Sequence, residues 1–469
     1  MMKIKSIAIL FLIFICFENS LHSQNGFTDK SEAKNETKNG LREGKWIDYL
    51  DKEHLETTKE FAAFYTLAVY EKGELTGLAR MYDTNNTLRK EITYLLGKKN
   101  GLVKEFYATG VLEVEWPYSN DEINGTEKTY FENGKIKSEA LLTNGILNGA
   151  LRQYFENGNL KMERFYVNGK ENDTVRFFFE SGMLYQEMPY KNDKIEGTMK
   201  EYYESGKLRK EMEFKDSMRN GIQRNYYENG NPELEGVYKN EVLNGVAKAY
   251  FPNGKVKEII PYKNGLVEGL GQEFYESGKI LSEGLYVNDT AHGIVKKYFE
   301  NGNLEFSVTM VRGKKHGVAK FYKENGVLDS EKPFKEGAVT GTGKVFYESG
   351  KVNFIIPFEN GKKNGITYEY YESGKLRAKI PQENDVEHGV CQEFYESGKI
   401  KLEIPYSNGK KSGIIYVYYE NGKLQKKIPC VNGRENGIAQ EYYKSGKLKS
   451  EVTYFDGEKI GKTKEYPDK

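Results

Sequence analysis

Histidine and cysteine are the side chains most often used for catalysis or metal binding, and this sequence has only five and three of them. His292, His316 and His388 share one position of a recurring 24-residue spacing, directly before a glycine. A metal site needs ligands that converge within a few ångströms, whereas equivalent side chains of adjacent β-hairpins would lie about 10 Å apart. We therefore expect these histidines to be loop residues, and we predict no metal site.

The sequence also lacks the motifs of nucleotide-binding and nucleophilic sites. Residues 457–463, GEKIGKT, are one residue short of the phosphate-binding pattern G-x-x-x-x-G-K-[ST]. The chain has no G-x-S-x-G motif and no zinc-type spacing of Cys and His. We predict that the protein is not an enzyme and that it holds no cofactor.

Aromatic side chains at a fixed spacing are the one pattern that could do chemistry along most of the chain. Exposed rings stack on sugars or enter a lipid interface. The alternative is that the rings pack hairpin against hairpin, because packing requires a ring in every copy. The candidate binding stripe consists of Tyr154, Phe178, Tyr202, Tyr226, Tyr250, Phe274 and Tyr298.

A second aromatic column follows the first directly, as in Tyr203, Tyr227 and Phe251. Adjacent residues of a strand point to opposite faces of a sheet. One column can therefore line an exposed groove while the other packs, and both roles stay open for the stripe.

Glycine sets the frame that must position these rings. Steps of 24 residues from Asn86 to Gly446 define sixteen positions, of which fifteen are glycine; we call these the index glycines. Each stripe residue lies four residues before one of them. Aromatic and β-branched runs bounded by Asn-Gly or Ser-Gly predict strands joined by tight turns. Each copy is therefore predicted to be a β-hairpin.

The turn at the index glycine leaves two registers open. A two-residue primed turn would place Glu372 opposite Lys375 and Tyr371 opposite Leu376, whereas a three-residue turn would change these pairs. Eight copies also carry a proline seven residues after the index glycine, for example Pro405. Because proline has no N–H to donate, we expect a bulge or an unpaired stretch there.

The predicted fold is all-β, an elongated single-layer twisted antiparallel sheet of tandem 24-residue β-hairpin repeats. Strands about 4.8 Å apart make each hairpin advance roughly 10 Å, so sixteen would span about 150 Å. Cys391 and Cys430 would lie three strand spacings apart. That distance of about 14 Å is too long for a disulfide, so both cysteines should stay unpaired.

The regular spacing does not extend to the N-terminal part of the chain. We divide the sequence into a polar leader at 24–39, an irregular first repeat with an insertion at 40–76, the repeat array at 77–461 and a C-terminal tail at 462–469. The leader is expected to be loose. The insertion includes residues 54–64, a segment compatible with a helix and with a capping role.

Residues 1–23 have the features of a secretory signal peptide: Lys3 and Lys5, an apolar run over 7–17 and a cleavage site after Ser23. We predict export to the periplasm, the cell surface or the extracellular medium. Lipidation at Cys16 is an alternative processing route. Cleavage would remove two lysines and one glutamate and leave 68 basic and 68 acidic residues. This neutral balance argues against a nucleic-acid partner.

The repeat unit Y-Y-E-S/N-G-K-L-x-x-E-x-x-Y-x-N-G-x-x-x-G resembles the MORN repeat, specifically the bacterial MORN-repeat variant, over roughly residues 40–461. Val69 to Gly77, VYEKGELTG, and Gly44-Lys45-Trp46 are the closest local matches. The resemblance implies a scaffold, a membrane-associated binder or an antitoxin-like partner of a toxin.

From these features we predict a non-enzymatic exported scaffold that binds a protein or a surface polymer. The alternatives are an antitoxin or immunity partner of a secreted toxin and a lipid-associated tether, the latter with peripheral membrane association. No oligomeric state is predicted.

Overall fold

The structure, a computed structural model, describes residues 26–469, so the predicted signal peptide lies outside the described residues. The chain divides into an N-terminal unit, Met1–Met218, and a C-terminal unit, Arg219–Lys469. The described residues form β-strands and one short 3₁₀ helix, η1, at Lys30–Glu32, with no α-helix. The all-β fold of tandem hairpins is confirmed in both units.

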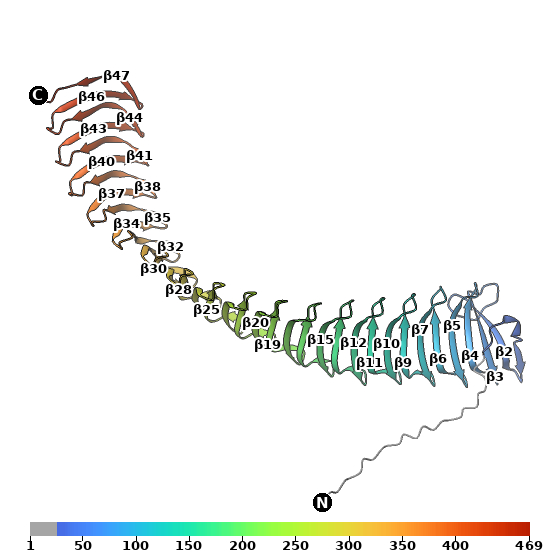
Figure 1. Ribbon diagram of the computed structural model, residues 1–469. Helices are drawn as coiled ribbons and strands as arrows, with labels where there is room; N and C mark the ends of the chain where they lie inside the picture. Colours follow the sequence, from blue (N-terminus) through green and yellow to red (C-terminus); the bar gives the residue numbers. More distant parts are fainter. Residues whose placement is uncertain (1–25) are drawn as a thin grey trace, which may run out of the picture. The chain divides into compact units, whose positions relative to one another are not determined.

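In the N-terminal unit, neighbouring strands pair antiparallel and lie side by side in chain order (Figure 1). Its strands are β1 (Glu36–Lys38), β2 (Leu41–Leu50), β3 (Phe64–Glu71), β4 (Glu74–Asp83), β5 (Leu88–Leu95), β6 (Lys98–Phe106), β7 (Leu112–Ser119), β8 (Glu122–Ile123), β9 (Gly125–Tyr130), β10 (Ile136–Thr143), β11 (Ile146–Tyr154), β12 (Leu160–Val167), β13 (Lys170–Glu171), β14 (Asp173–Phe178), β15 (Leu184–Lys191), β16 (Lys194–Ile195), β17 (Gly197–Tyr202) and β18 (Leu208–Lys215).

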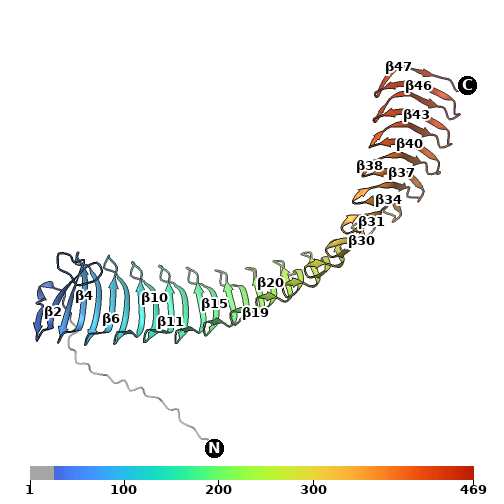
Figure 2. The ribbon, with the colours of Figure 1, turned by 180° about the vertical axis from the view of Figure 1, so that it is seen from behind.

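The C-terminal unit continues the same hairpin pattern, again with strands in chain order (Figure 2). Its strands are β19 (Met218–Tyr226, whose first residue belongs to the preceding unit), β20 (Pro232–Lys239), β21 (Val242–Leu243), β22 (Gly245–Tyr250), β23 (Val256–Lys263), β24 (Leu266–Val267), β25 (Gly269–Phe274), β26 (Ile280–Val287), β27 (Thr290–Ala291), β28 (Gly293–Tyr298), β29 (Leu304–Val311), β30 (Lys314–Tyr322), β31 (Leu328–Lys335), β32 (Ala338–Val339), β33 (Gly341–Phe346), β34 (Val352–Glu359), β35 (Lys362–Lys363), β36 (Gly365–Tyr370), β37 (Leu376–Glu383), β38 (Val386–Glu387), β39 (Gly389–Phe394), β40 (Ile400–Ser407), β41 (Lys410–Lys411), β42 (Gly413–Tyr418), β43 (Leu424–Val431), β44 (Arg434–Glu435), β45 (Gly437–Tyr442), β46 (Leu448–Phe455) and β47 (Glu458–Glu465).

The turn at the index glycine has three residues rather than two. Between β36 and β37, the Tyr371 N–H donates to the Lys375 carbonyl at 2.8 Å, and the Tyr371 carbonyl accepts from the Gly374 N–H at 2.8 Å. Gly374 has a φ of +87°, a left-handed conformation that favours glycine. The two-residue register, with Glu372 opposite Lys375 and Tyr371 opposite Leu376, is therefore wrong.

A β-bulge after this turn gives one strand an extra residue. Tyr370 pairs with Leu376, but Glu369 pairs with Ala378, so Arg377 is left without a partner across the ladder. The same shift recurs in the other regular hairpins, for example between β17 and β18.

The primed turn lies at the opposite end of the hairpin. Between the paired residues Glu359 and Lys362, Asn360 and Gly361 have φ values of +48° and +87°. Two central residues with positive φ define the type I′ turn, for which Asn-Gly is the preferred sequence.

The proline position coincides with an interruption of the ladder, as predicted. The Pro381 carbonyl accepts the His388 N–H at 3.1 Å, and the register between β37 and the strands that follow it shifts around this point. A Cβ on Gly389 would lie 3.2 Å from the Pro381 Cγ. The proline ring thus packs over the glycine that closes the repeat, and the missing N–H is not needed.

The two faces of the sheet differ in burial. We call one the core face; it carries Met199 and its cross-strand partner Met212, each 7% exposed. We call the other the ladder face; it carries Tyr202, paired with Leu208, and Lys200, paired with Glu211. The buried residues of the regular repeats, such as Val175 at 2% exposure, lie on the core face.

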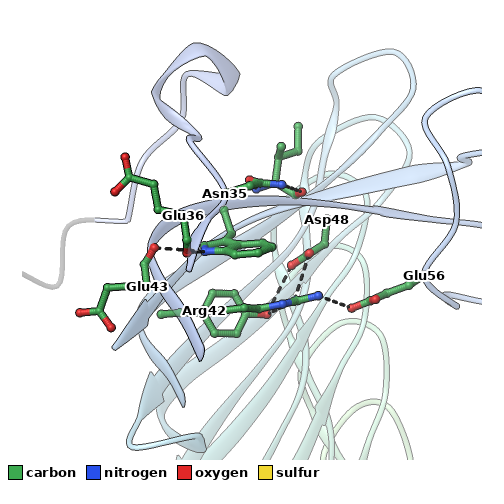
Figure 3. Close-up of polar contacts among 9 residues, drawn as sticks. Asn35, Glu36, Arg42, Glu43, Asp48 and Glu56 are labelled. Atoms are coloured by element: carbon green, nitrogen blue, oxygen red, sulfur yellow. Dashed lines mark hydrogen bonds and ion pairs between the residues drawn. The ribbon is translucent and has the colours of Figure 1, made fainter. Parts of the chain in front are cut away.

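The leader packs on the sheet from residue 26 onward, so the expectation of a loose leader is wrong there. Asn35 replaces a neighbouring strand at the edge of β2: its side-chain amide accepts from the Ile47 N–H at 2.9 Å and donates to the Ile47 carbonyl at 3.1 Å (Figure 3). The Trp46 indole donates to the Glu36 carbonyl at 3.1 Å. The segment 51–63, which is compatible with a helix in sequence, is a loop with turns.

Candidate interaction surface

The predicted stripe lies on the ladder face, where each strand meets the index-glycine turn. All seven stripe residues are half-buried. The hydroxyl of Tyr154 donates to Glu139 at 2.7 Å, and that of Tyr202 donates to Glu187 at 2.8 Å, in each case fifteen residues back in the preceding repeat. Tyr250 and Tyr298 make the equivalent bonds to Glu235 and Glu283 at 3.1 and 2.9 Å.

These environments keep the tyrosines protonated. Burial, followed by the hydrogen bond to the neighbouring glutamate, raises the pKa of Tyr154 and of Tyr202 to about 12. The phenol therefore acts as a donor that ties one repeat to the next.

The second aromatic column makes a different tie. The hydroxyls of Tyr227, Tyr275 and Tyr371 donate to the backbone carbonyl 23 residues ahead, at 2.9, 2.7 and 2.8 Å. Both aromatic columns thus take part in packing between repeats. A binding role for the stripe stays a prediction.

A row of alternating charges runs beside the stripe on the ladder face. Arg152 lies between two carboxylates, 2.7 Å from Glu163 and 3.4 Å from Glu139. The Glu163 side chain is only 14% exposed, so this row of charged side chains is partly shielded from solvent. Ion pairs of the same row join Arg80–Glu91, Lys128–Glu115, Arg176–Glu163, Lys200–Glu187, Arg224–Glu235, Lys296–Glu283 and Lys320–Glu331.

An exposed apolar row follows the charged row in the C-terminal unit. Its members lie eight residues before the index glycines and pair with the residues at the proline position, as Val246 does with Pro261 and Val390 with Pro405. We define the apolar row as Val246, Leu270, Ile294, Val318, Ile366, Val390 and Ile438, which are 43, 47, 57, 50, 42, 49 and 53% exposed.

The same positions are more polar in the N-terminal unit. They include Thr126, Thr174 and Thr198, with Leu102 as the large exposed apolar residue among them. Sequence reasoning missed this contrast, although the signal was present. After leucine at 78 and 102, the column is mostly threonine over 126–198 and mostly aliphatic from 222 onward, with Thr342 as the exception. The apolar row therefore belongs to one part of the array.

The chain's own leader shows how an extended segment lies on the ladder face. Phe27 is 4% exposed and packs with Tyr65 and Leu67, and its carbonyl accepts from Arg80 Nη1 at 3.3 Å. Gly26 comes so close that a Cβ there would clash with the carbonyl oxygen of Leu78. Leu78 occupies the apolar-row position of the first regular repeat, eight residues before Asn86.

The other residues considered from the sequence lie in strands, turns and bulges. The His292 N–H donates to the Leu285 carbonyl at 2.8 Å in the bulge before the closing glycine. Residues 457–463 belong to the last hairpin and strand β47. Cys391 and Cys430 are unpaired thiols, and burial raises the pKa of Cys391 to about 11. Within residues 26–469, no group of three or more His, Cys, Asp or Glu is placed to hold a metal ion.

Comparison with known families agrees with the repeat geometry. A family model described as the MORN repeat variant matches sixteen segments, at residues 75–95, 99–120, 123–144, 147–168, 174–192, 195–216, 219–240, 243–264, 267–288, 291–311, 315–336, 339–360, 363–384, 387–408, 411–432 and 435–456. The chain belongs to the MORN repeat variant family. In this MORN array each matched segment contains one index-glycine position.

No curated protein matches the chain. Among solved structures, the crystal structure of TcdB2-TccC3 is 11% identical, with a TM-score of 0.15, and the match covers 88% of this chain and 24% of that one. The crystal structure of TcdB2-TccC3-TEV is 12% identical, with the same TM-score of 0.15 and coverages of 90% and 24%. The chain thus spans about a quarter of the structures it matches, and TM-scores this low carry no argument. In the described part of the chain, no helix has the length and apolar character needed to cross a bilayer.

Proposed function

We propose that this MORN-repeat chain is a non-enzymatic scaffold, exported by means of residues 1–23, that binds an extended segment of a protein partner along the apolar row. One observation supports the proposal: aliphatic side chains at one position of successive repeats are about half exposed. By contrast, tyrosine hydroxyls and charged side chains of the other columns bond to neighbouring repeats.

The spacing of the row favours a particular partner. Two strands separate equivalent residues of successive repeats, which corresponds to about 10 Å. Three residues of a polyproline II chain span about 9 Å and complete one turn, so every third side chain returns to the same side of the chain. A segment with an apolar side chain at every third residue would therefore match the row.

The leader supports the same mode of binding. It places an aromatic side chain, Phe27, against the ladder face of the first repeats. Its neighbour Gly26 passes directly over Leu78. The apolar row of the C-terminal unit occupies the repeat position equivalent to Leu78, and its aliphatic side chains are exposed.

Covering this row would give modest affinity. Burial of four side chains, at about 60 Å² each and roughly 25 cal/mol per Å², contributes about 6 kcal/mol before the cost of ordering the partner. Binding of one segment should therefore be weak and should increase with the number of repeats engaged.

The test compares two series of labelled synthetic peptides that have the same amino-acid composition. The first series has an apolar residue at every third position, and the second has one at every second position. We expect the first series to bind at least ten-fold more tightly, as measured by fluorescence anisotropy. The combined variant Val246→Asn, Leu270→Asn, Ile294→Asn and Val318→Asn should lose this preference.

The matched control is Thr126→Asn, Thr174→Asn and Thr198→Asn, at the same positions of the N-terminal unit. This control should bind like the wild type, and both variants should retain the circular dichroism spectrum of the wild type. Equal binding of the two peptide series, or unchanged binding by the row variant, would contradict the proposal.

A further inference from the structure

The core face of the first repeats contains a cavity of about 420 Å³. It is bounded by β2 to β5 and by the insertion that follows β2, with Tyr70 and Tyr94 among its walls. This volume falls within the range of small-molecule sites. The sequence did not predict it, because it depends on the path of the irregular insertion.

Small residues and the insertion together create this cavity. Ala68 and Ala79 form part of its lining, and both are buried, at 1% and 6% exposure. The insertion supplies His54 and Glu56 to the lining. His54 has a φ of +64°, and its ring packs 4.9 Å from that of Phe64, which fixes the insertion beside the sheet.

One wall of the cavity is a polar network around Asp48 (Figure 3). Arg42 lies 3.2 Å from the Asp48 carboxylate, donates to the Tyr70 hydroxyl at 2.9 Å and contacts Glu56 at 3.1 Å. The Tyr70 hydroxyl in turn donates to Asp48 at 3.3 Å. Burial raises the pKa of Asp48, and the charge of Arg42 opposes that effect.

The charges around the cavity leave an excess of negative charge. Asp48 and Glu56 share the single guanidinium of Arg42. The lining residue Lys90 is paired with Glu105 at 2.7 Å, so its charge is already offset. The Asp48 side chain is only 14% exposed, and an anionic ligand would meet two carboxylates there. A cationic group would be favoured instead.

We propose that this cavity binds a small organic amine, with its ammonium group beside Asp48 and Glu56 and its apolar part on Ala68 and Ala79, between Tyr70 and Tyr94. Aromatic walls and a carboxylate are a combination that suits an ammonium ion attached to a ring or short chain. The inference is independent of the proposed function, because the cavity lies on the core face and the apolar row on the ladder face.

The experiment uses three probes of similar size: phenethylamine, 2-phenylethanol and phenylacetate. The Trp46 ring lies 5.9 Å from that of Tyr70, so Trp46 fluorescence can report binding. Trp116→Phe makes Trp46 the single tryptophan, since the chain has two. Phenethylamine should bind at least ten-fold more tightly than phenylacetate, and the neutral alcohol should fall between them.

Two variants and one control locate the site. Ala79→Leu should fill the cavity and abolish binding, whereas Ala319→Leu, at the same repeat position in the C-terminal unit, should leave it unchanged. Glu56→Gln changes a side chain that is 68% exposed, so folding should survive while the affinity for phenethylamine falls several-fold. Equal affinity for the three probes, no saturation by about 10 mM phenethylamine, or full affinity in both Ala79→Leu and Glu56→Gln would overturn the proposal.

Discussion

Tyr154 and Tyr202 of the stripe, and Tyr130 at the same repeat position, combine packing with one directed hydrogen bond between repeats. Tyr130, Tyr154 and Tyr202 all donate to a glutamate fifteen residues earlier, at 2.8, 2.7 and 2.8 Å. Phenylalanine occupies the same position as Phe178 and Phe274, so the ring is required more strictly than the hydroxyl. The hydroxyl should therefore adjust stability rather than determine the fold.

We expect the protein to lose stability between pH 10 and about 12. Burial and the bonds to glutamate raise the pKa of Tyr130, Tyr154 and Tyr202 to about 12, above an unfolded value of about 10. The stabilisation is complete below pH 10 and declines as the pH rises towards 12, because the unfolded chain releases these protons first. Urea midpoints measured from pH 8 to 12 test this.

The triple variant Tyr130→Phe, Tyr154→Phe and Tyr202→Phe supplies the control. It should be less stable at pH 8, by up to about 1 kcal/mol per lost hydrogen bond. Its stability should then change less between pH 10 and 12. If the triple variant lost as much stability between pH 10 and 12 as the wild type, these tyrosines would not be the cause of the pH dependence.

The closing glycine and the proline of a repeat should be coupled. Gly365 has a φ of +113°, and a Cβ there would lie 3.0 Å from the Pro357 Cγ. Gly365→Ala should cost more than Gly374→Ala, whose Cβ would have nothing within 4 Å. We expect the free energy of unfolding, measured with urea, to fall by about 2 kcal/mol for Gly365→Ala and by about 1 kcal/mol for Gly374→Ala. Pro357→Ala should reduce the cost of Gly365→Ala, and a cost independent of residue 357 would refute the coupling.

The hairpin was predictable as an element, but its register was not. Glu-Ser-Gly-Lys at 372–375 is compatible with both a two-residue and a three-residue turn, because glycine accepts positive φ in either. The structure has the three-residue turn, with the compensating bulge at Arg377. The proline-linked bulge could be predicted, because a missing N–H has the same consequence in any strand.

The first repeat could not be predicted from the repeat pattern because it departs from it. The insertion follows a path set by contacts such as the Thr57 N–H to the Tyr49 carbonyl at 2.8 Å. These contacts have no counterpart in the sequence columns. The leader was likewise predicted to be loose because its composition is polar, although its residue Phe27 is buried against the sheet.

Removal of one complete repeat should preserve the fold. Deletion of residues 366–389 joins Gly365 to Val390 and so reproduces the sequence step from Gly389 to Val390. Neighbouring repeats then present the same columns to each other. Circular dichroism and thermal melting should show a folded β protein with a slightly lower enthalpy of unfolding.

Deletion of half a repeat, residues 366–377, is the matched comparison. It would join strands whose core and ladder positions no longer correspond, so the melting temperature should fall far more. Equal melting of the two deletions would refute the repeat boundaries.

At the scale of the whole molecule, repeats that share one backbone conformation differ in the side chains that they expose to solvent. The charged row is present in both units, whereas the apolar row lies in the C-terminal unit, where Thr342 interrupts it, and the amine-sized cavity lies in the first repeats. A repeat array can in this way hold several independent surfaces. The family resemblance predicted the scaffold, but not which columns are free to bind.

The most direct test of the scaffold account is hydroxyl-radical footprinting of the full chain with the tightest peptide of the period-three series. We predict protection of Val246, Leu270, Ile294 and Val318, with Thr126, Thr174 and Thr198 unchanged. Protection confined to the stripe residues Tyr154, Phe178, Tyr202, Tyr226, Tyr250, Phe274 and Tyr298, or protection of neither set, would contradict the account.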